Sequence, residues 1–424
     1  MAVRAVVMIL DGMRRDLISA AATPTLHAAA AAAERFARHR SIFPSVTRVS
    51  AATIATGCRP ARHGLQGNSV ALRENGRLVR RDVGKPDFFD AMRRANGRTL
   101  RVPTMAERLA RAGHAAVAYS NVSPGAAYAL DPDGHGHVYH RAGSFAPGRR
   151  RLPEAEGLPI TGDPAGDRAM TERFCADLET GRATLSILWL GEPDHVQHAN
   201  PLGGPAHLAA LKIADACAAR VIETCERVGR RDGEAPLLVL GSDHGHRAIR
   251  RAINLDRALV DARLKAAPES DEVVAAANGT AALIYLDRVA ATRQAAIAEF
   301  LRAQDWVGRV LEGAALAEVG LDPDDGSGLA LAIDMRAYHE PNEHGVMGLS
   351  DGVVTDDETP YWLGNGNHGG LAAHEQDPFL MIRGPGFTPG AVRETPTSLV
   401  DIAPTVLRHL GLPTDAMDGR PLQA

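Results

Sequence analysis

Short apolar runs alternate with amphipathic segments along most of the chain. The runs are nearly continuous and rich in β-branched and aliphatic residues, a pattern typical of strands covered on both faces. The amphipathic segment 205–228 predicts a long helix between two of these runs. The alternation therefore predicts an α/β fold with a mostly parallel sheet. We expect its strands at residues 3–10, 115–119, 184–190, 237–240 and 379–384.

Helix-start signals and breaker residues mark out the segments between these strands. Thr23 followed by Pro24 predicts a helix start, and the Ala-rich segment behind it predicts a helix that runs to about Arg38. The capping-box pattern at 104–107 predicts a second helix. Residues 120–165 are rich in Gly, Pro, Asp and His, and we expect them to form loops.

The character of the sequence changes between residues 253 and 345. Here we expect strands at 281–286 and 329–333 and a helix at 288–302. This combination predicts a small αβ cap inserted between strands of the main sheet. The predicted organisation is a core of residues 1–252 and 346–424 with a cap of residues 253–345.

Three of the predicted strands end directly in acids or histidines. Asp11 follows the first strand, Asp194 and His198 follow the third, and Asp243 and His244 follow the fourth. Ligands in open α/β sheets bind beyond the carboxyl ends of the strands, so we expect these side chains to gather at one edge. Carboxylates and imidazoles together suit Zn²⁺, or Mn²⁺ and similar ions.

Taken singly, most of these motifs also have a purely structural explanation. Asp11 alone is typical of a strand-ending turn, and the Asp-x-x-x-His pair alone of a solvated loop. Asp243 and His244 fit that explanation less well, because two ionisable groups at the mouth of a buried strand need partners that offset desolvation. His368 stands between an asparagine and two glycines, which offer it no apolar face to pack against.

The segment 42–68 is the candidate for the reactive group. Ile42 and Phe43 are expected to end a strand, and Thr47 to stand at the N-terminus of a helix. An arrangement of this kind exposes a hydroxyl nucleophile where backbone N–H groups point at an anion.

Composition excludes several classes of partner. The 424 residues carry a net charge of −4 that is dispersed along the chain, which argues against a nucleic-acid polymer or an anionic membrane as the partner. The four cysteines show no paired spacing, and we expect reduced thiols. No apolar run approaches the roughly 18 residues of a membrane span, and the N-terminal run lacks a secretory pattern. We therefore expect a cytoplasmic protein.

The ordered set of motifs resembles the alkaline phosphatase superfamily, and within it the type I phosphodiesterase/nucleotide pyrophosphatase branch, which also holds phosphonoacetate hydrolase. The matching pieces span nearly the whole chain in family order. They are Leu10-Asp11-Gly12, Phe43-Pro44-Ser45-x-Thr47, Thr56-Gly57-x-x-Pro60-x-x-His63-Gly64-x-x-x-Asn68, Glu192-Pro193-Asp194-x-x-x-His198, Ser242-Asp243-His244-Gly245, His368-Gly369-Gly370, and the tail from Asp401 to Arg420.

The resemblance implies a three-layer αβα sandwich with two divalent metal ions, Zn²⁺ in the first place and Mn²⁺ as the alternative. Thr47 would attack phosphorus and form a phosphothreonyl intermediate, and Asn68 would donate its amide N–H to a phosphoryl oxygen. One ion would be held by Asp194, His198 and His368, and the other by Asp11, Thr47, Asp243 and His244.

Two departures from related families affect the choice of nucleophile and substrate. Cys58 begins a Cys-x-Pro-x-Arg sequence like that of sulfatases, in which the Thr-Gly turn lies nine residues after the cysteine; here Thr56-Gly57 lies nine residues after Thr47. Arg48 stands where relatives have other residues, so it either binds the phosphoryl group or points to solvent. The lysines that hold the carboxylate in phosphonoacetate hydrolase have no counterpart here, although Arg48 or Arg101 could replace them.

The sequence thus predicts a phosphodiesterase or nucleotide pyrophosphatase that acts on a small-molecule phosphodiester, pyrophosphate or phosphonate. Phosphonoacetate-type C–P hydrolysis and phosphomonoester hydrolysis are the enzymatic alternatives. A metal-binding scaffold without activity is the alternative from another class, and a homodimer is left open.

Overall fold

The computed structural model describes residues 3–181, 183–356 and 359–423. Its centre is a ten-stranded sheet of order β21-β2-β20-β11-β1-β10-β6-β7-β8-β9. The five central strands from β11 to β7 run parallel. The bounds are β1 Ala5–Leu10, β2 Glu34–Phe36, β6 Ala116–Ser120, β7 His137–Tyr139, β8 Phe145–Ala146, β9 Arg150–Arg151, β10 Leu185–Leu190, β11 Leu237–Gly241, β20 Leu380–Arg383 and β21 Val392–Arg393.

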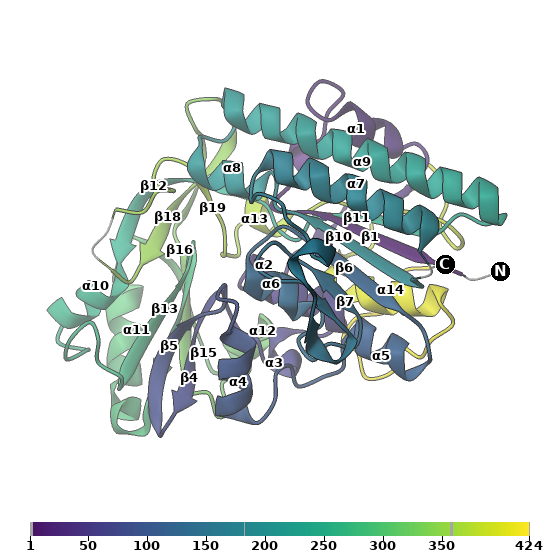
Figure 1. Cartoon of the computed structure of the whole chain (residues 1–424). Helices are drawn as coiled ribbons and strands as arrows, with labels where there is room; N and C mark the ends of the chain where they lie inside the picture. Colours follow the sequence, from purple (N-terminus) through teal and green to yellow (C-terminus); the bar gives the residue numbers. More distant parts are fainter. Residues whose placement is uncertain (1–2, 182, 357–358, 424) are drawn as a thin grey trace.

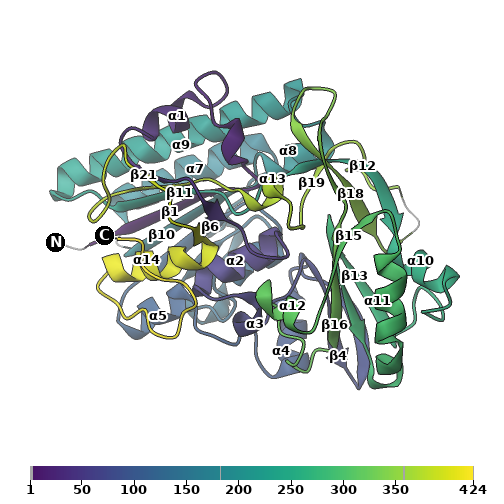
Figure 2. The same ribbon diagram turned by 180° about the vertical axis from the view of Figure 1, so that it is seen from behind.

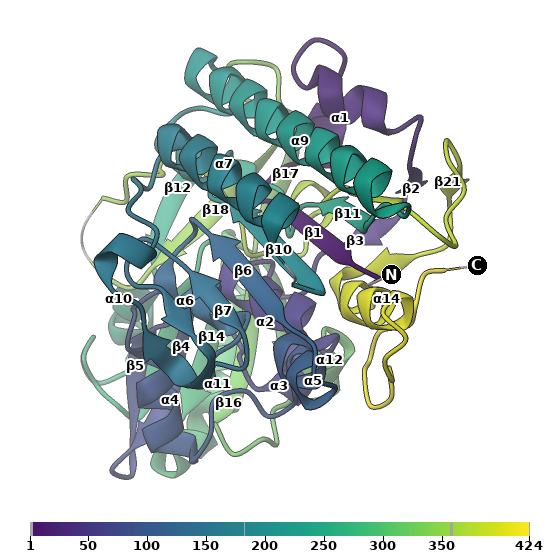
Figure 3. The same ribbon diagram turned by 45° about the vertical axis from the view of Figure 1, so that its right-hand side comes forward.

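Helices cover both faces of this sheet and make three layers (Figure 1, Figure 3). One face carries α1 (Pro24–Ala29), α7 (Pro164–Thr180) and α9 (Pro205–Asp232). The other face carries α2 (Thr47–Thr56), α3 (Pro60–His63), α5 (Met105–Arg111), α6 (Pro124–Ala129) and α14 (Ile402–His409).

Strand β1 shows why helices must cover both faces of the central sheet. All six of its residues are buried. Val7 and Ile9 belong to the hydrophobic cluster under α2 and α14, whereas Met8 and Leu10 belong to the cluster under α7 and α9. A continuous apolar run therefore supplies two cores at once, because successive side chains of a strand point to opposite faces.

Three smaller sheets stand beside the carboxyl ends of the central strands. The first is β13-β14-β16-β15, and α10 and α11 cover the side that faces away from the central sheet (Figure 2). The second is β17-β18-β12-β19, and the third is the hairpin β4-β5. Their bounds are β4 Ser69–Glu74, β5 Arg77–Asp82, β12 Arg247–Asn254, β13 Val273–Asn278, β14 Ala281–Leu286, β15 Val307–Glu312, β16 Leu329–Met335, β17 Ala337–Pro341, β18 Met347–Val354, β19 Gly366–Asn367, α10 Leu255–Asp261 and α11 Gln294–Arg302.

The remaining elements are short. The pair β3-β22 links the two ends of the chain near α14. Small helices lie beside the hairpin, beside β15, after β10 and before β20. Their bounds are β3 His39–Arg40, β22 Thr397–Ser398, α4 Phe88–Asn96, α8 Asp194–Ala199, α12 Ala314–Glu318 and α13 Ala373–Gln376.

The sheet β13-β14-β16-β15 lies wholly within residues 253–345, the segment expected to form a cap. Strand β12 crosses the predicted boundary at 252, and it pairs in parallel with β18 beyond the boundary at 346. The division into core and cap stays a prediction.

Three sequence-based expectations about local structure were wrong. The first helix ends at Ala29 rather than near Arg38, because Glu34–Phe36 pairs with β20 as a strand. Ile42 and Phe43 are buried but lie outside any strand. Residues 120–165 form α6 and three short strands that extend the central sheet, so they are not only loops. In the first case, pairing with β20, which is distant in sequence, decides the structure.

All four cysteines are unpaired and buried, as expected. Among the described residues, no helix has both the length and the apolar character needed to span a bilayer.

Candidate functional site

The acids and histidines singled out in the sequence meet at the carboxyl edge of the central sheet. Asp11 directly follows β1, Asp194 begins α8 a few residues after β10, and Asp243 follows β11. The backbone N–H of Asp194 donates to the carbonyl oxygen of Asp11, which ties two of these strand ends together. The structure thus brings these side chains together at one edge of the sheet, as the sequence predicted.

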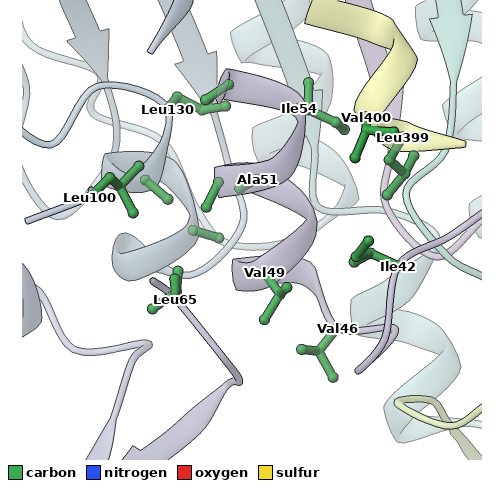
Figure 4. Packing of buried hydrophobic residues seen from close by; sticks show 14 of the residues in the cluster. Ile42, Val46, Val49, Ala51, Ile54, Leu65, Leu100, Leu130, Leu399 and Val400 are labelled. Carbon is green, nitrogen blue, oxygen red and sulfur yellow. The ribbon is translucent and has the colours of Figure 1, made fainter. Parts of the chain in front are cut away.

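Thr47 reaches this edge as the first residue of α2. Val46 is extended and Gly57 ends the helix in the left-handed region, at φ 68°. Most of the helix is buried, and its apolar residues pack between Ile42, Leu399 and Val400 on one side and Leu65, Leu100 and Leu130 on the other (Figure 4). The packing fixes the helix axis, so the Thr47 hydroxyl has a defined position.

One group of side chains surrounds Thr47, and we call Asp11, Thr47, Asp243 and His244 the carboxylate-rich set. The Thr47 Oγ1 lies 3.1 Å from His244 Nε2 and 3.5 Å from Asp11 Oδ1. His244 Nε2 lies 3.3 Å from Asp11 Oδ1 and 3.1 Å from Asp243 Oδ2. At most 7% of each of these residues is exposed.

A second group centres on Asp194, and we call Asp194, His198, His246 and His368 the histidine-rich set. His198 Nε2 and His368 Nε2 lie 3.4 and 3.5 Å from Asp194 Oδ1. His246 Nε2 lies closer, at 2.7 Å from the same oxygen. The ring of His368 stacks on that of His244 with centroids 3.6 Å apart, so the two sets adjoin.

The second ring nitrogen of three histidines points at a backbone carbonyl. The Nδ1 atoms of His198, His244 and His368 lie 2.9, 3.2 and 2.7 Å from the carbonyl oxygens of Gly366, Gly245 and Ser45. A carbonyl only accepts, so Nδ1 carries the proton in each ring. In the neutral tautomer that this fixes, each Nε2 presents a lone pair to the carboxylates around it.

Burial and mutual repulsion perturb the acids of the carboxylate-rich set. Burial raises the pKa of Asp11 well above its usual range, and the nearby carboxylates Asp243 and Asp194 raise it further. Burial also raises the pKa of Asp243, although His244 opposes this. These are the shifts expected of crowded carboxylates that lack a compensating positive charge.

The histidine-rich set shows the complementary pattern. Burial, followed by the neighbouring His244 and His246, lowers the pKa of His368 well below its usual range. Burial lowers the pKa of His246 to about 3. Burial alone would raise the pKa of Asp194, but the contacts of Asp194 with His198 and His246 outweigh it and hold this pKa low. Neutral imidazoles beside a carboxylate are the form in which histidine binds metals.

The residues present fit divalent metal ions. Ligands 2.0–2.2 Å from a tetrahedral ion are separated by about 3.3–3.6 Å. The ligand-atom distances in the two sets, with the His246 contact excluded, are 3.1–3.5 Å and lie close to this spacing. Among the described residues, the buried Asp243 Oδ2 has no hydrogen-bond partner. It lies 3.1 Å from His244 Nε2, and a cation bound by the two atoms would stabilise this arrangement.

A cleft of about 430 Å³ opens over both sets. The backbone N–H of Arg48 donates to Asn68 Oδ1 at 3.2 Å, which leaves the Asn68 amide nitrogen free to face the cleft. Arg48 Nε donates to Ser123 Oγ at 3.0 Å. Burial lowers the pKa of Arg48, while Asp82, Asp194 and Asp11 raise it. The cleft is lined by Asp11, Thr47, Arg48, Asn68, Ser123, Asp194, His195, His198, Asn278, Asp356, Tyr361, Trp362 and His368, among others.

Two further candidates lie away from the cleft. Arg101 Nη2 pairs with Asp325 Oδ2 at 2.8 Å, so it does not take the place of a carboxylate-binding lysine. Cys58 follows the C-terminal end of α2, at the opposite end from Thr47, and its thiol is buried near the Ala416 carbonyl. Burial raises the pKa of Cys58, which disfavours the reactive thiolate.

His246 is the site residue that sequence reasoning missed. The donor atoms of Asp194, His244, His246 and His368 all lie within 4.8 Å of one another, as do those of Asp11, Asp243 and His244. The available signal was the run Asp-His-Gly-His after a buried strand, in which only the first histidine was considered.

Comparisons with known proteins agree with this geometry. A family profile described as type I phosphodiesterase / nucleotide pyrophosphatase matches residues 5–346. A search among curated proteins found no match.

Solved structures show the same fold. Mouse ectonucleotide pyrophosphatase / phosphodiesterase 5, an inactive threonine-to-alanine variant in complex with AMP, is similar with a TM-score of 0.71, 18% identity, and 98% and 97% of the two chains covered. The human protein of that name has a TM-score of 0.67 at 17% identity, covering 98% and 97%. Phosphonoacetate hydrolase from Sinorhizobium meliloti, with phosphonoformate, has a TM-score of 0.63 at 18% identity, covering 97% and 96%.

These likenesses confirm the expected alkaline-phosphatase-like α/β fold. The profile covers most of the chain. The chain therefore belongs to the type I phosphodiesterase / nucleotide pyrophosphatase family and is a hydrolase of phosphoric ester or phosphonate bonds.

Proposed function

We propose that this protein is a phosphodiesterase or pyrophosphatase that uses Thr47 as its nucleophile and two divalent metal ions. The observation that carries the proposal is the orientation of three imidazoles, whose Nδ1 atoms face backbone carbonyls and whose Nε2 lone pairs face carboxylates. Lone pairs at this spacing repel one another unless a proton or a metal ion lies between them, and two adjoining groups of this kind at one strand edge suit metal ions. The ions would be held by Asp11, Thr47, Asp243 and His244, and by Asp194, His198 and His368.

Thr47 is positioned for attack on phosphorus. Two bound dications would favour the ionised hydroxyl and offset the charge of the phosphoryl group. The Thr47 oxygen would form a bond to phosphorus while the leaving group departs with the bonding electrons, and water would later cleave the phosphothreonine. The N-terminus of α2 adds backbone N–H groups near the same oxygen. The mouse relative, inactive as a threonine-to-alanine variant, is consistent with a hydroxyl nucleophile.

Asn68 and Arg48 are the substrate-binding residues of the proposal. The hydrogen bond from the Arg48 N–H fixes the Asn68 carbonyl oxygen, so the NH₂ group can donate to a non-bridging phosphoryl oxygen. Arg48 lines the cleft, and its guanidinium makes no ion pair within 4 Å among the described residues. It can therefore bind a substrate anion.

The remaining features of the proposal follow from composition and donor type. Three imidazoles among the metal-binding side chains favour Zn²⁺, and the carboxylates admit Mn²⁺. The dispersed charge supports a small-molecule substrate rather than a nucleic-acid polymer. The free cysteines support a cytoplasmic location.

Phosphonate hydrolysis is a second candidate, and Arg48 is the observation that favours it. The relative from Sinorhizobium meliloti was solved with phosphonoacetate and with phosphonoformate, both of which carry a carboxylate. Arg48, held by Ser123, is a cation of this cleft that could bind such a carboxylate.

A substrate panel on zinc- or manganese-loaded protein tests these functions. It contains bis-p-nitrophenyl phosphate, p-nitrophenyl phosphate, p-nitrophenyl phenylphosphonate, p-nitrophenyl sulfate and phosphonoacetate. We expect the highest kcat/KM on the diester, and peptide mass spectrometry of acid-quenched turnover should find phosphate on Thr47.

Other outcomes of the panel select the alternatives. Preferred cleavage of phosphonoacetate or of the monoester would replace the diester assignment. Turnover that leaves Thr47 unmodified, and that persists in Thr47→Ala, would contradict the nucleophile. Failure of every substrate would favour a metal-binding scaffold.

A further inference from the structure

We infer that His246 is a positioning residue of the histidine-rich set, which donates a hydrogen bond to Asp194 and is not itself a metal ligand. The inference rests on the metal binding proposed above and assigns a role to the residue that the sequence motifs leave out. Its basis is the contrast between His246 and the three other histidines of the two sets.

The ring of His246 sits in a slot that only glycine allows. A Cβ atom at Gly12 would lie 2.7 Å from His246 Nε2, and one at Gly366 would lie 2.8 Å from His246 Nδ1. Gly12 also has a φ of 67°, which other residues rarely adopt. The Arg14 guanidinium donates to the His246 carbonyl at 3.1 Å and fixes the backbone behind the ring. The imidazole is fully buried and is held against Asp194.

Distance separates a hydrogen bond from shared coordination. His246 Nε2 lies 2.7 Å from Asp194 Oδ1, within the range of a charge-assisted hydrogen bond. His198 and His368 lie 3.4 and 3.5 Å from that oxygen, longer than an ordinary hydrogen bond and close to the tetrahedral ligand spacing. The compact grouping of donor atoms includes His246, so proximity alone would have made it a ligand.

Tautomer preference points the same way. Among the described residues, His246 Nδ1 has no hydrogen-bond partner, whereas the Nδ1 atoms of His198 and His368 lie within hydrogen-bond distance of backbone carbonyls. If His246 bound a metal through Nε2, its Nδ1 would carry a buried proton that has no acceptor. If Nε2 carries the proton, Asp194 accepts a hydrogen bond from this N–H, and Nδ1 is left only with an unused lone pair.

A hydrogen bond from His246 Nε2–H would orient the Asp194 carboxylate and draw negative charge from its ligating oxygen. Partners of this kind hold a carboxylate in one coordination geometry, and their loss typically costs 10–100-fold in metal affinity or activity. The effect concerns the histidine-rich set alone, because among the described residues His246 makes no hydrogen bond to Asp11, Thr47 or Asp243.

The test compares His246→Leu, which removes the N–H, with His246→Gln, which can supply an amide N–H to Asp194. Zinc affinity is measured by competition with a chromophoric chelator, and the imidazoles per zinc by X-ray absorption of the zinc-saturated protein. We expect His246→Leu to weaken one zinc site about 10–100-fold and His246→Gln to recover most of the loss. The imidazole number should stay at about 1.5 per zinc in all three proteins.

His39→Leu is the matched control. His39 is also fully buried, with one ring nitrogen 3.0 Å from Thr397 Oγ1 and the other without a partner among the described residues. It should lose comparable thermal stability but keep both zinc affinities.

A fall in imidazoles per zinc in His246→Leu would make His246 a ligand and overturn the inference. Unchanged zinc affinity would overturn it as well. Wild-type protein that binds zinc as described but hydrolyses nothing in the substrate panel would contradict the proposed function alone, because neither readout depends on turnover.

Discussion

The carboxylate-rich and histidine-rich sets adjoin in one cleft, yet they are built differently. The first contributes two carboxylates, one imidazole and the Thr47 hydroxyl, and the second contributes one carboxylate and three imidazoles. A dication would thus be neutralised by the first set and would keep a net positive charge in the second. The difference suggests separate tasks, with the reactive hydroxyl in one set and a more electrophilic ion in the other.

The largest effect on activity is expected from removing the Thr47 hydroxyl, a group that the histidine-rich set lacks. Thr47→Ala should lower kcat/KM on the diester by at least about a thousandfold, because no other described hydroxyl stands at this position. Metal content should stay near that of wild type, since three ligands remain. Ser50→Ala is the matched control, because the Ser50 hydroxyl is buried in the same helix without a partner among the described residues. Loss of metal together with activity would make Thr47 chiefly a ligand.

Ligand removal should separate the two sets by metal preference. His368→Ala and Asp243→Asn should each lower the zinc content from about two ions to about one, with kcat/KM down by about a hundredfold or more. Carboxylates suit Mn²⁺ better than imidazoles do. The electron paramagnetic resonance signal of bound Mn²⁺ should therefore survive in His368→Ala and weaken in Asp243→Asn. Equal signals in the two variants would show that the donor difference does not select metals.

Asn68 tests the substrate side of the comparison, since among the described residues it makes no hydrogen bond to either set. Asn68→Ala should lower kcat/KM by about a hundredfold, the usual cost of one donor to a transition-state oxyanion, without a change in metal content. Asn68→Asp keeps an acceptor for the Arg48 N–H but loses the donor and adds a negative charge, so its loss should be at least as large. Faster turnover in Asn68→Asp than in Asn68→Ala would rule out a phosphoryl contact.

The sequence predicted where the ligands gather because strand direction and side-chain chemistry are local properties. A buried parallel strand followed by Asp11, or by Asp243 and His244, places those groups at one edge whatever the rest of the chain does. His246 was missed because its role depends on glycines at 12 and 366, which are distant in sequence and meet only in the folded chain.

Distant pairing also explains the errors in the fold. The Ala-rich segment after Pro24 has strong helix propensity, but pairing with β20 overrides it from Glu34 onward. Strands β7, β8 and β9 are two or three residues long, too short to give a periodic signal. The sequence left open whether Arg48 or Arg101 faces the cleft. The folded chain decides it, because Asp325, which is distant in sequence, forms an ion pair with Arg101.

The smallest effect on turnover is expected from substituting Glu375, which supports the loop that carries His368. Glu375 Oε2 accepts from the Gly370 N–H and the Thr280 hydroxyl, both at 2.5 Å, and so anchors the loop that carries this histidine. Burial raises the pKa of Glu375 to about 7, although Arg247 opposes the shift. The folded chain therefore binds a proton that the unfolded chain releases near pH 4.5, and stability falls as pH rises from about 5 to above 7.

Glu375→Gln keeps an acceptor but does not titrate, so its stability should not fall over this range, and the difference from wild type should approach about 3 kcal/mol at pH 8. Urea unfolding at several pH values measures it, with Glu318→Gln, an exposed glutamate of α12, as the control. Turnover at neutral pH should change by less than about twofold, because the loop keeps its hydrogen bonds. Parallel stability curves for wild type and Glu375→Gln would show that the carboxylate is already ionised in the folded protein. The histidine-rich set would then depend on a buried charge in its supporting loop.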